Sequence, residues 1–392
     1  MKILHTSDWH LGHTIYNDSQ IDAQKDMLNQ ITKIVSDQQP DALIISGDVY
    51  DTTQPSADVQ QMFANAIVAM HDACKGITIV CIAGNHDSGS KHMIYHTPWH
   101  ALNVHMLGSI NNDSTLEDYI IDIPGKGFVV AVPYAADRFM PQDVFKNLSN
   151  KVAERNSNNL PVVLSAHLAL SKADWRGHDF SSDDNIGGLN CQDLAIFGDG
   201  YDYVALGHIH KQQSLDQEKR IWYSGTPIAV SFDEVYPDNN HGVLMVDIPK
   251  HGASVSVVPI NIDNLNPLVN LPSGYNEFAD WDKVKELLEQ YPDNIASFVR
   301  LNVEVEDILT AGANDDAHQI IKDKACKNCY INSKRKGKDP SQSETKSKAY
   351  TTSEFQKLNF IEVAKIHMGT DFDDEIAAML NEVKNMLNGN ND

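Results

Sequence analysis

The sequence lacks several features that would place it in a large protein class. No apolar run among its 392 residues reaches the ~18 residues that a membrane-spanning helix needs. The five cysteines are few and odd in number, which argues against a disulfide framework. A G-x-x-x-x-G-K-[ST] motif is missing, so any ATP-driven step would belong to a partner. Residues 1–5 lead directly into a strand-like run, and we therefore expect a cytoplasmic protein that does not contact membranes.

Positive charge is also scarce. Lys and Arg total 31 against 54 Asp and Glu, which gives a formal net charge of −23. Since a protein that holds nucleic acid with its own surface is usually basic, we do not expect a self-sufficient, tight DNA binder. The chain can still act on phosphates where bound cations reverse the local charge or where a partner supplies the grip. The 42% of apolar residues exclude a wholly disordered chain, and the length suits two domains.

Short apolar runs alternate with helix-like patterns over the first part of the chain. Their β-branched residues predict buried strands at residues 3–4, 42–45, 77–82, 162–164 and 203–206. Two amphipathic stripes with helical spacing lie between the first three runs. They consist of Met27, Leu28, Ile31, Ile34 and Val35, and of Val59, Met62, Phe63, Ala66, Ile67 and Met70. Such strand–helix–strand units predict an α/β domain with covered sheet faces.

The later pattern is more hairpin-like. Adjacent strands are expected at residues 103–107, 118–123 and 127–133, and a terminal hairpin at 242–247 and 253–260. A second sheet packed on the first would accommodate them. Residues 262–275, rich in Pro, Asn and Gly, are predicted to be a linker. In the smaller unit that follows, we expect helices at 281–290 and 315–324 and a strand at 295–306.

Polar side chains cluster directly after each of the five predicted strands. The clusters contain Asp8, His10, Asp48, Asp51, Asn85, His86, Asp87, His167, His208 and His210. Because ligands bind outside the carboxyl ends of strands in an open α/β sheet, we expect these side chains to converge on one edge. The pairs Asp8/His10 and His208/His210 are each expected on one side of an extended segment, since side chains alternate along a strand.

The residue types predict a metal centre. Carboxylate, amide and imidazole donors without cysteine favour a divalent metal such as Mn²⁺, Fe²⁺ or Zn²⁺ over a thiolate site. Seven or more ligands are too many for one ion and suit two ions about 3.5–4 Å apart that share a carboxylate. A single Asp or His after a strand is usually a cap or turn residue. The ordered set DxH, GDxxD, GNHD, H and GHxH, each after a strand, favours the metal centre.

These motifs resemble those of the calcineurin-like metallophosphoesterase superfamily. Residues 8–12 (DWHLG), 201–210 (YDYVALGHIH), 223–227 (YSGTP) and 231–234 (SFDE) are similar to its DNA-break nucleases of the SbcD and Mre–Rad type. The resemblance covers about residues 1–260 and is looser over the tail. It implies an α/β fold, namely a two-sheet metallophosphoesterase sandwich with helices on its outer faces, a small α+β capping domain and C-terminal helices.

The resemblance also implies domain boundaries. They are 1–262 for the nuclease domain, 276–332 for the capping domain, 333–350 for a flexible basic linker and 351–392 for C-terminal helices that bind an ATPase. An apolar stripe from Phe372 to Leu387 fits that last segment. Docking of this stripe on its own domain is the alternative.

Carried over residue by residue, the family pattern implies a role for each member of the site. One ion lies among Asp8, His10, Asp48 and His210, and the other among Asp48, Asn85, His167 and His208, so that Asp48 bridges them. His86 is a catalytic residue that faces the substrate phosphate, and Asp87 orients it. Asp51 stands where some relatives carry His and is expected outside the ligand set. Residues 232–234 (FDE) are expected to be structural.

The implied activity is DNA cleavage in repair and recombination. The resemblance implies a Mn²⁺-dependent 3′→5′ exonuclease on double-strand ends and an endonuclease on single strands and hairpins, with Mg²⁺ as the alternative metal. It also implies a homodimer joined to an SbcC-type, SMC-like ATPase in a heterotetramer. Two alternatives stay open: a phosphodiesterase for small molecules such as cyclic nucleotides, and a non-catalytic scaffold. A protein phosphatase is disfavoured, because GNHD and GDVYDT differ from GNHE and GDxxDR.

Each of three other segments has a structural and a functional interpretation. The CxxC at residues 326–329 is structural, or a redox or metal half-site in a dimer. The basic residues between 334 and 348 form a solvated linker or touch a DNA backbone. The loop at 174–180 packs as an ordinary loop, or offers an aromatic side chain on which a base stacks.

Overall fold

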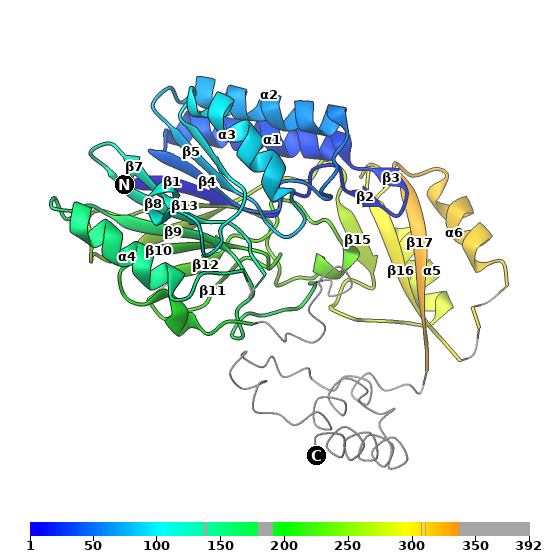
Figure 1. Ribbon diagram of the computed structural model, residues 1–392. Coiled ribbons are helices and arrows are strands. Elements are labelled where there is room, and N and C mark those ends of the chain that lie inside the picture. Colours follow the sequence, from blue (N-terminus) through cyan, green and yellow to red (C-terminus); the bar gives the residue numbers. More distant parts are fainter. Residues whose placement is uncertain (137–138, 179–190, 219, 307, 310, 337–392) are drawn as a thin grey trace, which may run out of the picture.

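The structure is a computed structural model that describes residues 1–136, 139–178, 191–218, 220–306, 308–309 and 311–336. Within these ranges two six-stranded sheets, a three-stranded sheet and a two-stranded hairpin are formed. The two large sheets lie face to face, and the small sheet stands at one end of them (Figure 1). The predicted α/β two-sheet architecture with a small extra sheet is therefore confirmed.

The first large sheet has the strand order β14-β13-β1-β4-β5-β6. Its strands are β1 (Lys2–Thr6), β4 (Ala42–Ser46), β5 (Thr78–Ile82), β6 (Val104–Leu107), β13 (Gly242–Asp247) and β14 (Ser256–Asn261). Strands β1, β4, β5 and β6 run parallel, whereas β13 pairs antiparallel with both β1 and β14. The predicted terminal hairpin is thus confirmed and lies at the edge of this sheet.

The second large sheet has the order β11-β12-β10-β9-β8-β7. Its strands are β7 (Ile120–Ile123), β8 (Gly127–Val132), β9 (Val162–His167), β10 (Tyr203–Gly207), β11 (Gln213–Ser214) and β12 (Ile221–Tyr223). Strand β6 pairs with β5 in the first sheet, and β7 pairs with β8 in the second. The expectation that residues 103–107 and 118–123 are adjacent strands is therefore wrong, because the chain changes sheets between them.

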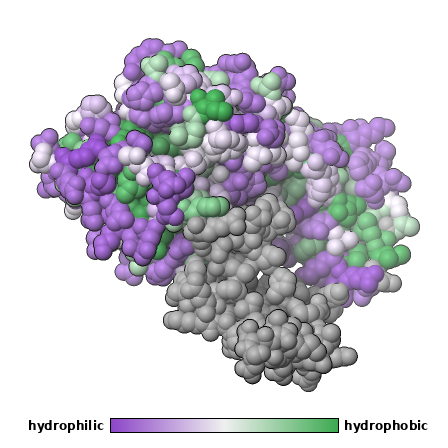
Figure 2. All heavy atoms as spheres, in the orientation of Figure 1, coloured by the Kyte–Doolittle hydropathy of each residue, from purple (hydrophilic) through white to green (hydrophobic). Residues whose placement is uncertain are grey.

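Helices cover the outer faces of the two large sheets. The helices of this unit are α1 (Ile21–Gln38), α2 (Ala57–Ala73), α3 (Gly89–His100) and α4 (Val144–Arg155), with short 3-10 turns η1 (Leu116–Tyr119), η2 (Leu194–Phe197) and η3 (Phe232–Glu234). Both predicted apolar stripes lie on α1 and α2 and pack on the first sheet, whereas α4 lies beside the second (Figure 1). Hydrophilic residues predominate over the α4 end of the face seen in Figure 2. Within the described part of the chain, no helix combines the length and apolar character that crossing a membrane requires.

Strand β4 shows why these runs fold as fully buried strands. Ala42 and Ile44 face the apolar layer between the two sheets, and Leu43 and Ile45 face α1 and α2. All four side chains are completely buried. A strand with two apolar faces fits only between two layers, and this places its carboxyl end beside the loops of the opposite sheet.

The small domain is built from β15 (Leu268–Leu271), α5 (Trp281–Gln290), β16 (Phe298–Val305), α6 (Ala313–Ile321) and β17 (Asn328–Arg335). Helix α5 has its predicted bounds, and the Asp280 side chain caps it by accepting a hydrogen bond from the Lys283 N–H at 2.9 Å. The linker expected at 262–275 is partly wrong, because β15 lies inside it. The basic linker expected from residue 333 is wrong at its start, because residues 333–335 end β17 and pair with residues 303–305.

Other predictions for the tail lie beyond what the structure describes. Residues 337–392, which include most of the basic segment and the expected C-terminal helices, are outside the described ranges. The CxxC lies at the start of β17, where Cys329 is buried and Cys326 is partly exposed. All five cysteines are free thiols in the structure.

An apolar and aromatic joint connects the small domain to the two-sheet unit. Ile15, Phe232, Leu268 and Phe298 form one buried cluster, and they come from hairpin strand β2 (Thr14–Ile15), η3, β15 and β16. The second strand of that hairpin, β3 (Asp18–Ser19), carries a carboxylate that accepts hydrogen bonds from two side chains of β17. The small domain therefore contacts the two-sheet unit at the β2–β3 hairpin and at η3.

Candidate metal centre

The predicted polar clusters follow strands of both large sheets. The strands are β1, β4 and β5 in the first sheet, and β9 and β10 in the second. The clusters therefore meet across the sandwich, which corrects the expectation of a single sheet edge. The stacking of two sheets, which the sequence pattern does not fix, brings the five loops together.

The backbone of these loops is left-handed at four of the predicted ligands. The φ angles are 52° at Asp8, 43° at His10, 49° at Asp48 and 103° at His208. The extended geometry expected for the D-x-H and H-x-H pairs is therefore wrong. A non-glycine residue held in this region costs about 1–3 kcal/mol, and such residues gather at functional sites. The N–H groups of Asp8 and His10 donate to the loop after β4, at 3.0 and 3.1 Å, and this fixes the two loops against each other.

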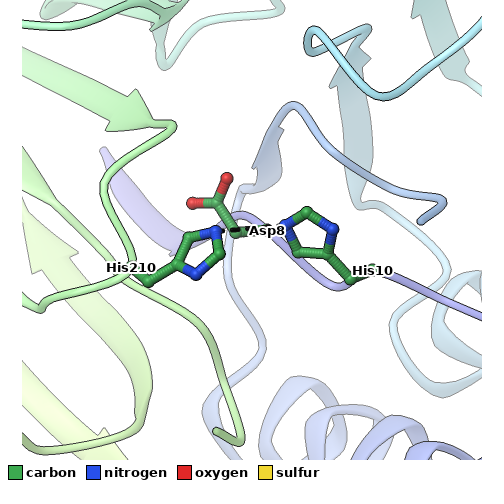
Figure 3. Close-up of side chains that lie close together, drawn as sticks. All are labelled: Asp8, His10 and His210. Atoms are coloured by element: carbon green, nitrogen blue, oxygen red, sulfur yellow. Dashed lines mark hydrogen bonds between the residues drawn. The ribbon is translucent and has the colours of Figure 1, made fainter. Parts of the chain in front are cut away.

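Asp8, His10 and His210 form the first group of donor atoms. Their side chains point toward one another from the loops after β1 and β10 (Figure 3). The Nε2 atoms of the two histidines are 3.2 Å apart, and a carboxylate oxygen of Asp8 lies with one nitrogen from each ring so that all three are within 4.8 Å. Asp8 and His10 are buried. We call this set the first donor group.

Two carboxylates orient the histidines of the first donor group. Nδ1 of His210 donates to Oε1 of Glu234 at 2.8 Å, which leaves the Nε2 lone pair facing His10. Oδ1 of Asp51 lies 3.5 Å from Nδ1 of His10 and 2.8 Å from Nδ1 of His13. Each ring is thus held from the side that faces away from its neighbour.

Asn85, His167 and His208 form the second donor group. Oδ1 of Asn85 lies 2.9 Å from Nε2 of His167 and 3.1 Å from Nδ1 of His208. Nδ1 of His167 donates to the backbone carbonyl of Ser46 at 2.8 Å, so its Nε2 lone pair faces the centre. His167 is buried, and the backbone at the end of β4 accepts the hydrogen bond from its Nδ1 atom.

Asp48 lies between the two donor groups. Its Oδ2 atom is 3.8 Å from Nε2 of His10 and 3.4 Å from Nε2 of His167. Its Oδ1 atom accepts the backbone N–H of His86 at 2.9 Å, which fixes the carboxylate. A Cβ at Gly84 would stand 2.1 Å from that same Oδ1 atom, so the approach of the two loops requires glycine at this position.

His86 and Asp87 occupy the neighbouring loop. Nδ1 of His86 lies 3.1 Å from the carbonyl oxygen of Asp51, and its ring centroid is 4.9 Å from that of His10. His10, Asp48 and His86 also bring donor atoms within 4.8 Å of one another. The ring is partly exposed at the rim of the centre.

The carboxylate of Asp87 serves the loop backbones. It accepts hydrogen bonds from the N–H groups of Val49, Tyr50 and Gly84 at 2.9–3.1 Å. The ring of His86 instead meets the backbone carbonyl of Asp51, and the expected orientation of His86 by Asp87 gains no support from these contacts. Asp87 joins the loop that carries Asp48 to the loop that carries Asn85.

In the absence of a cation, the carboxylates draw protons onto two histidines. Burial opposes the charged form of His10, but the hydrogen bond to Asp51 and the charges of Asp48 and Asp8 outweigh it and raise the pKa of His10 to about 9. Burial also opposes a charged His167, yet the carboxylate of Asp48 raises its pKa to about 9. Burial and the charge on His10 hold the pKa of His210 well below its usual range. A protonated His10 can thus donate from Nε2 to the Nε2 lone pair of the neutral His210. The surrounding carboxylates favour positive charge at this position.

The donor set fits divalent cations. Two groups of buried and partly buried donors contain carboxylate, amide and imidazole atoms, and the Asp48 carboxylate lies near both groups. The outward nitrogens of His167 and His210 are already engaged, so that their Nε2 lone pairs face inward. The buried His and Asp clusters are consistent with a dimetal site.

Further residues near the centre lie outside the predicted ligand set. Glu234 was assigned to a structural turn, but it contacts His210 directly. The ring of His178 lies 5.0 Å from that of His208 and 5.5 Å from that of His210, and the ring of Trp175 lies 6.3 Å from that of His208. The polar loop after β9 was singled out for its aromatic residues, and its position after a strand that carries a predicted ligand was the available signal.

The fold and the two donor groups define a metal-dependent phosphoesterase. A sequence model of the calcineurin-like phosphoesterase family matches residues 1–212, and the chain belongs to this family. The chain is 27% identical to the SbcD component of the nuclease SbcCD from Bacillus subtilis, over 82% of this chain and 83% of the relative. It is 28% identical to the protein of the same name from Rhodobacter capsulatus, over 70% of this chain and 72% of the relative.

Two solved structures match the chain at low similarity. One is a dimetal phosphatase from Danio rerio, with 12% identity, a TM-score of 0.40 and coverage of 66% of this chain and 98% of the other. The other is TT1561 of Thermus thermophilus, with 12% identity, a TM-score of 0.38 and the same coverage.

Proposed function

We propose that this chain is a two-metal phosphodiesterase that cleaves DNA as the nuclease component of an SbcCD-type complex. The position of Asp48 between two donor groups is the observation that carries the enzymatic part. The likeness to two proteins named as components of the nuclease SbcCD, over most of their length, supports DNA as the substrate. The proposed reactions are 3′→5′ exonuclease action on double-strand ends and endonuclease action on single strands and hairpins.

The proposed ligands are those of the two donor groups together with Asp48. Asp8, His10 and His210 would hold one ion, and Asn85, His167 and His208 the other, with Asp48 shared. Divalent ions bound there would activate a water and offset the charge that develops on the phosphodiester. Mn²⁺ is the proposed metal, with Mg²⁺ as the alternative.

His86 is the proposed proton donor and phosphate contact. The carbonyl of Asp51 can only accept, so Nδ1 of His86 carries its proton in that hydrogen bond. The ring is partly exposed, so Nε2 can contact a phosphate oxygen. When the ring is an imidazolium, Nε2 carries a second proton, which it can give to the leaving oxygen and so become neutral. Asp87 then acts on the loop that carries His86 and not on its ring.

The acidic composition is compatible with this substrate. The net charge of −23 disfavours tight DNA binding by the protein surface alone. Bound cations would reverse the charge at the centre, and we propose that a homodimer joined to an SbcC-type ATPase supplies the remaining grip. Residues 351–392, the proposed ATPase-binding helices, lie outside the described ranges.

The test compares DNA with a small diester. The purified chain is incubated with hairpin, blunt duplex and single-stranded DNA, and with bis(p-nitrophenyl) phosphate, in Mn²⁺ or Mg²⁺ and with or without the ATPase. Cleavage of the hairpin and the duplex end in Mn²⁺ is expected, and Asp48→Ala should abolish it. Hydrolysis of the small diester without any DNA cleavage would favour a small-molecule phosphodiesterase and overturn the proposal.

A further inference from the structure

The turn that carries Glu234 is held by two side chains of the small domain. Nδ2 of Asn270, on β15, donates to the carbonyl oxygens of Phe232 at 2.8 Å and of Val235 at 2.9 Å. These two carbonyls flank η3 at its first residue and just after its last. One buried amide group thus fixes both ends of the turn, with Glu234 between them.

Arg300, on β16, completes this contact. Its Nε atom donates to Oδ1 of Asn270 at 2.9 Å, and its Nη1 atom lies 2.7 Å from Oδ1 of Asp233. The guanidinium carbon also lies 5.2 Å from the centroid of the Phe232 ring. Asn270 and Arg300 therefore form one hydrogen-bonded unit that engages the turn through backbone, carboxylate and aromatic ring, and we call this unit the clamp.

The side chain of Glu234 reaches from this turn to the first donor group. Oε1 accepts the Nδ1 proton of His210 at 2.8 Å, while Oε2 accepts from the Thr226 hydroxyl at 2.9 Å and from the Val230 N–H at 3.3 Å. Glu234 is 1% exposed, so it has no solvent-filled space in which to adopt another position. A shift of the turn would be passed directly to the ring of His210.

We propose that Asn270 and Arg300 are positioning residues for the metal site, and that the small domain sets the affinity of the first donor group for a divalent cation by holding Glu234 against His210. This proposal rests on the assignment of His210 as a metal ligand in the proposed function. Partners that orient a ligating histidine typically change metal affinity by 10–100-fold when they are removed. The clamp does not contact His210 itself but acts through Glu234. Its loss should therefore lower the affinity for a divalent cation about tenfold at one of the two metal positions.

The test uses Asn270→Asp in the full chain. This change keeps the side-chain shape and the oxygen that accepts from Arg300, but it removes the N–H groups that hold the turn. Mn²⁺ binding is followed by calorimetry and by the electron spin resonance of bound Mn²⁺. We expect about tenfold weaker binding at one position, unchanged binding at the other and a retained melting transition. If Asn270→Asp folds poorly, Arg300→Lys replaces it in the test. This change keeps the positive charge but loses the planar guanidinium that contacts both Asn270 and Asp233, so it should weaken Mn²⁺ binding at the same position.

A control and a double variant separate positioning from general loosening. Asn328→Ala removes a 2.8 Å hydrogen bond from β17 to Asp18, which also joins the small domain to the two-sheet unit but does not touch the turn. It should leave both Mn²⁺ affinities unchanged. In a Glu234→Gln background, Asn270→Asp should add little, because the clamp acts through Glu234.

The outcomes distinguish this proposal from the proposed function. Equal losses in Asn270→Asp and Asn328→Ala, or fully additive losses with Glu234→Gln, would overturn the clamp. A wild-type chain that binds two Mn²⁺ ions with the expected variant pattern, but cleaves no DNA, would overturn the nuclease and leave the clamp in place. If the wild-type chain cleaves DNA in Mn²⁺ but Asn270→Asp changes neither Mn²⁺ affinity, the clamp is overturned and the proposed nuclease function stands.

Discussion

Carboxylate side chains orient both histidines in one half of the candidate centre, whereas the backbone of a strand orients a histidine in the other half. His10 and His210 turn their Nδ1 atoms toward the carboxylates of Asp51 and Glu234. His167 instead donates from Nδ1 to the carbonyl of the last residue of β4. A carboxylate partner makes an imidazole a stronger base and a better ligand, and it can be changed without moving a sheet.

The comparison indicates where each half can be altered. The first donor group depends on side chains that other segments can move, among them the turn held by the small domain. The second donor group depends on the stacking of the two large sheets, because a histidine of β9 is held by β4. Selective changes in affinity should therefore be easier to produce in the first group.

Substitution of Asp48 should abolish metal binding in both halves of the centre. Asp48→Ala takes away the carboxylate oxygen that lies between Nε2 of His10 and Nε2 of His167, so both metal positions should be lost together. Activity on any phosphodiester is expected to fall by on the order of 10³ or more. Calorimetry with Mn²⁺ and diester hydrolysis provide the measurements. Retention of one tight Mn²⁺ site would contradict the central position of Asp48.

Gly84→Ala should disturb the same carboxylate through sterics alone. The added Cβ would stand 2.1 Å from Oδ1 of Asp48, so the carboxylate or the loop must move. We expect a loss of activity of about 10²-fold, comparable with the removal of a positioned catalytic group. Gly76→Ala is the matched control, because nothing lies within 4 Å of a Cβ there. Similar activity in the two variants would show that the close approach is not needed.

Asp51→Asn should affect the first donor group only. The change keeps the shape but removes the charge that faces His10 and His13, so we expect about tenfold weaker Mn²⁺ binding at one position. Asp37→Asn, on the exposed face of α1, serves as the control. Titration with Mn²⁺ under electron spin resonance resolves the two positions. Equal weakening at both would contradict the division into halves.

His5 offers a test of stability that leaves the centre intact. It is buried between the sheets, with Nδ1 2.9 Å from the Tyr203 hydroxyl, and burial lowers its pKa to about 3. The folded protein keeps it neutral while the unfolded chain binds a proton below its ordinary pKa of 6.5, so it destabilises the fold as pH falls from 6.5 toward 3, by up to about 1.4 kcal/mol per unit. His5→Phe should flatten this part of the urea-unfolding profile and leave Mn²⁺ affinity unchanged. An unaltered slope would show that His5 is charged in the fold.

The elements with strong periodicity were predictable from the sequence. Strands β4 and β5 have apolar side chains on both faces, and α1, α2 and α5 show clear stripes or caps. The four-residue strand β15 was missed because Pro and Asn surround it, and β17 because it is polar and half-exposed along most of its length. The sequence pattern also did not predict that β6 and β7 belong to different sheets. Which sheet each strand joins depends on tertiary packing and not on the sequence of either strand.

The membership of the candidate site was predictable further than its geometry. Motif order named the residues that the loops bring together, but the left-handed backbone at Asp8 and His10 follows from hydrogen bonds to a neighbouring loop and not from local propensity. Glu234 was assigned to structure because a lone acidic residue in a turn has no recognisable spacing. Its contact with His210 exists only after β10 and η3 are packed together.

The origin of the donors in two separate sheets has a thermodynamic consequence. A cation bound there would attach one layer of the sandwich to the other, and it would bind only the folded chain. At a free concentration a hundredfold above its dissociation constant, one such ion would add about 2.7 kcal/mol to the free energy of unfolding. Removal of the metal by a chelator would then lower the free energy of unfolding of the whole sandwich as well as stop catalysis. The melting temperature of the domain would therefore rise with the free concentration of divalent metal.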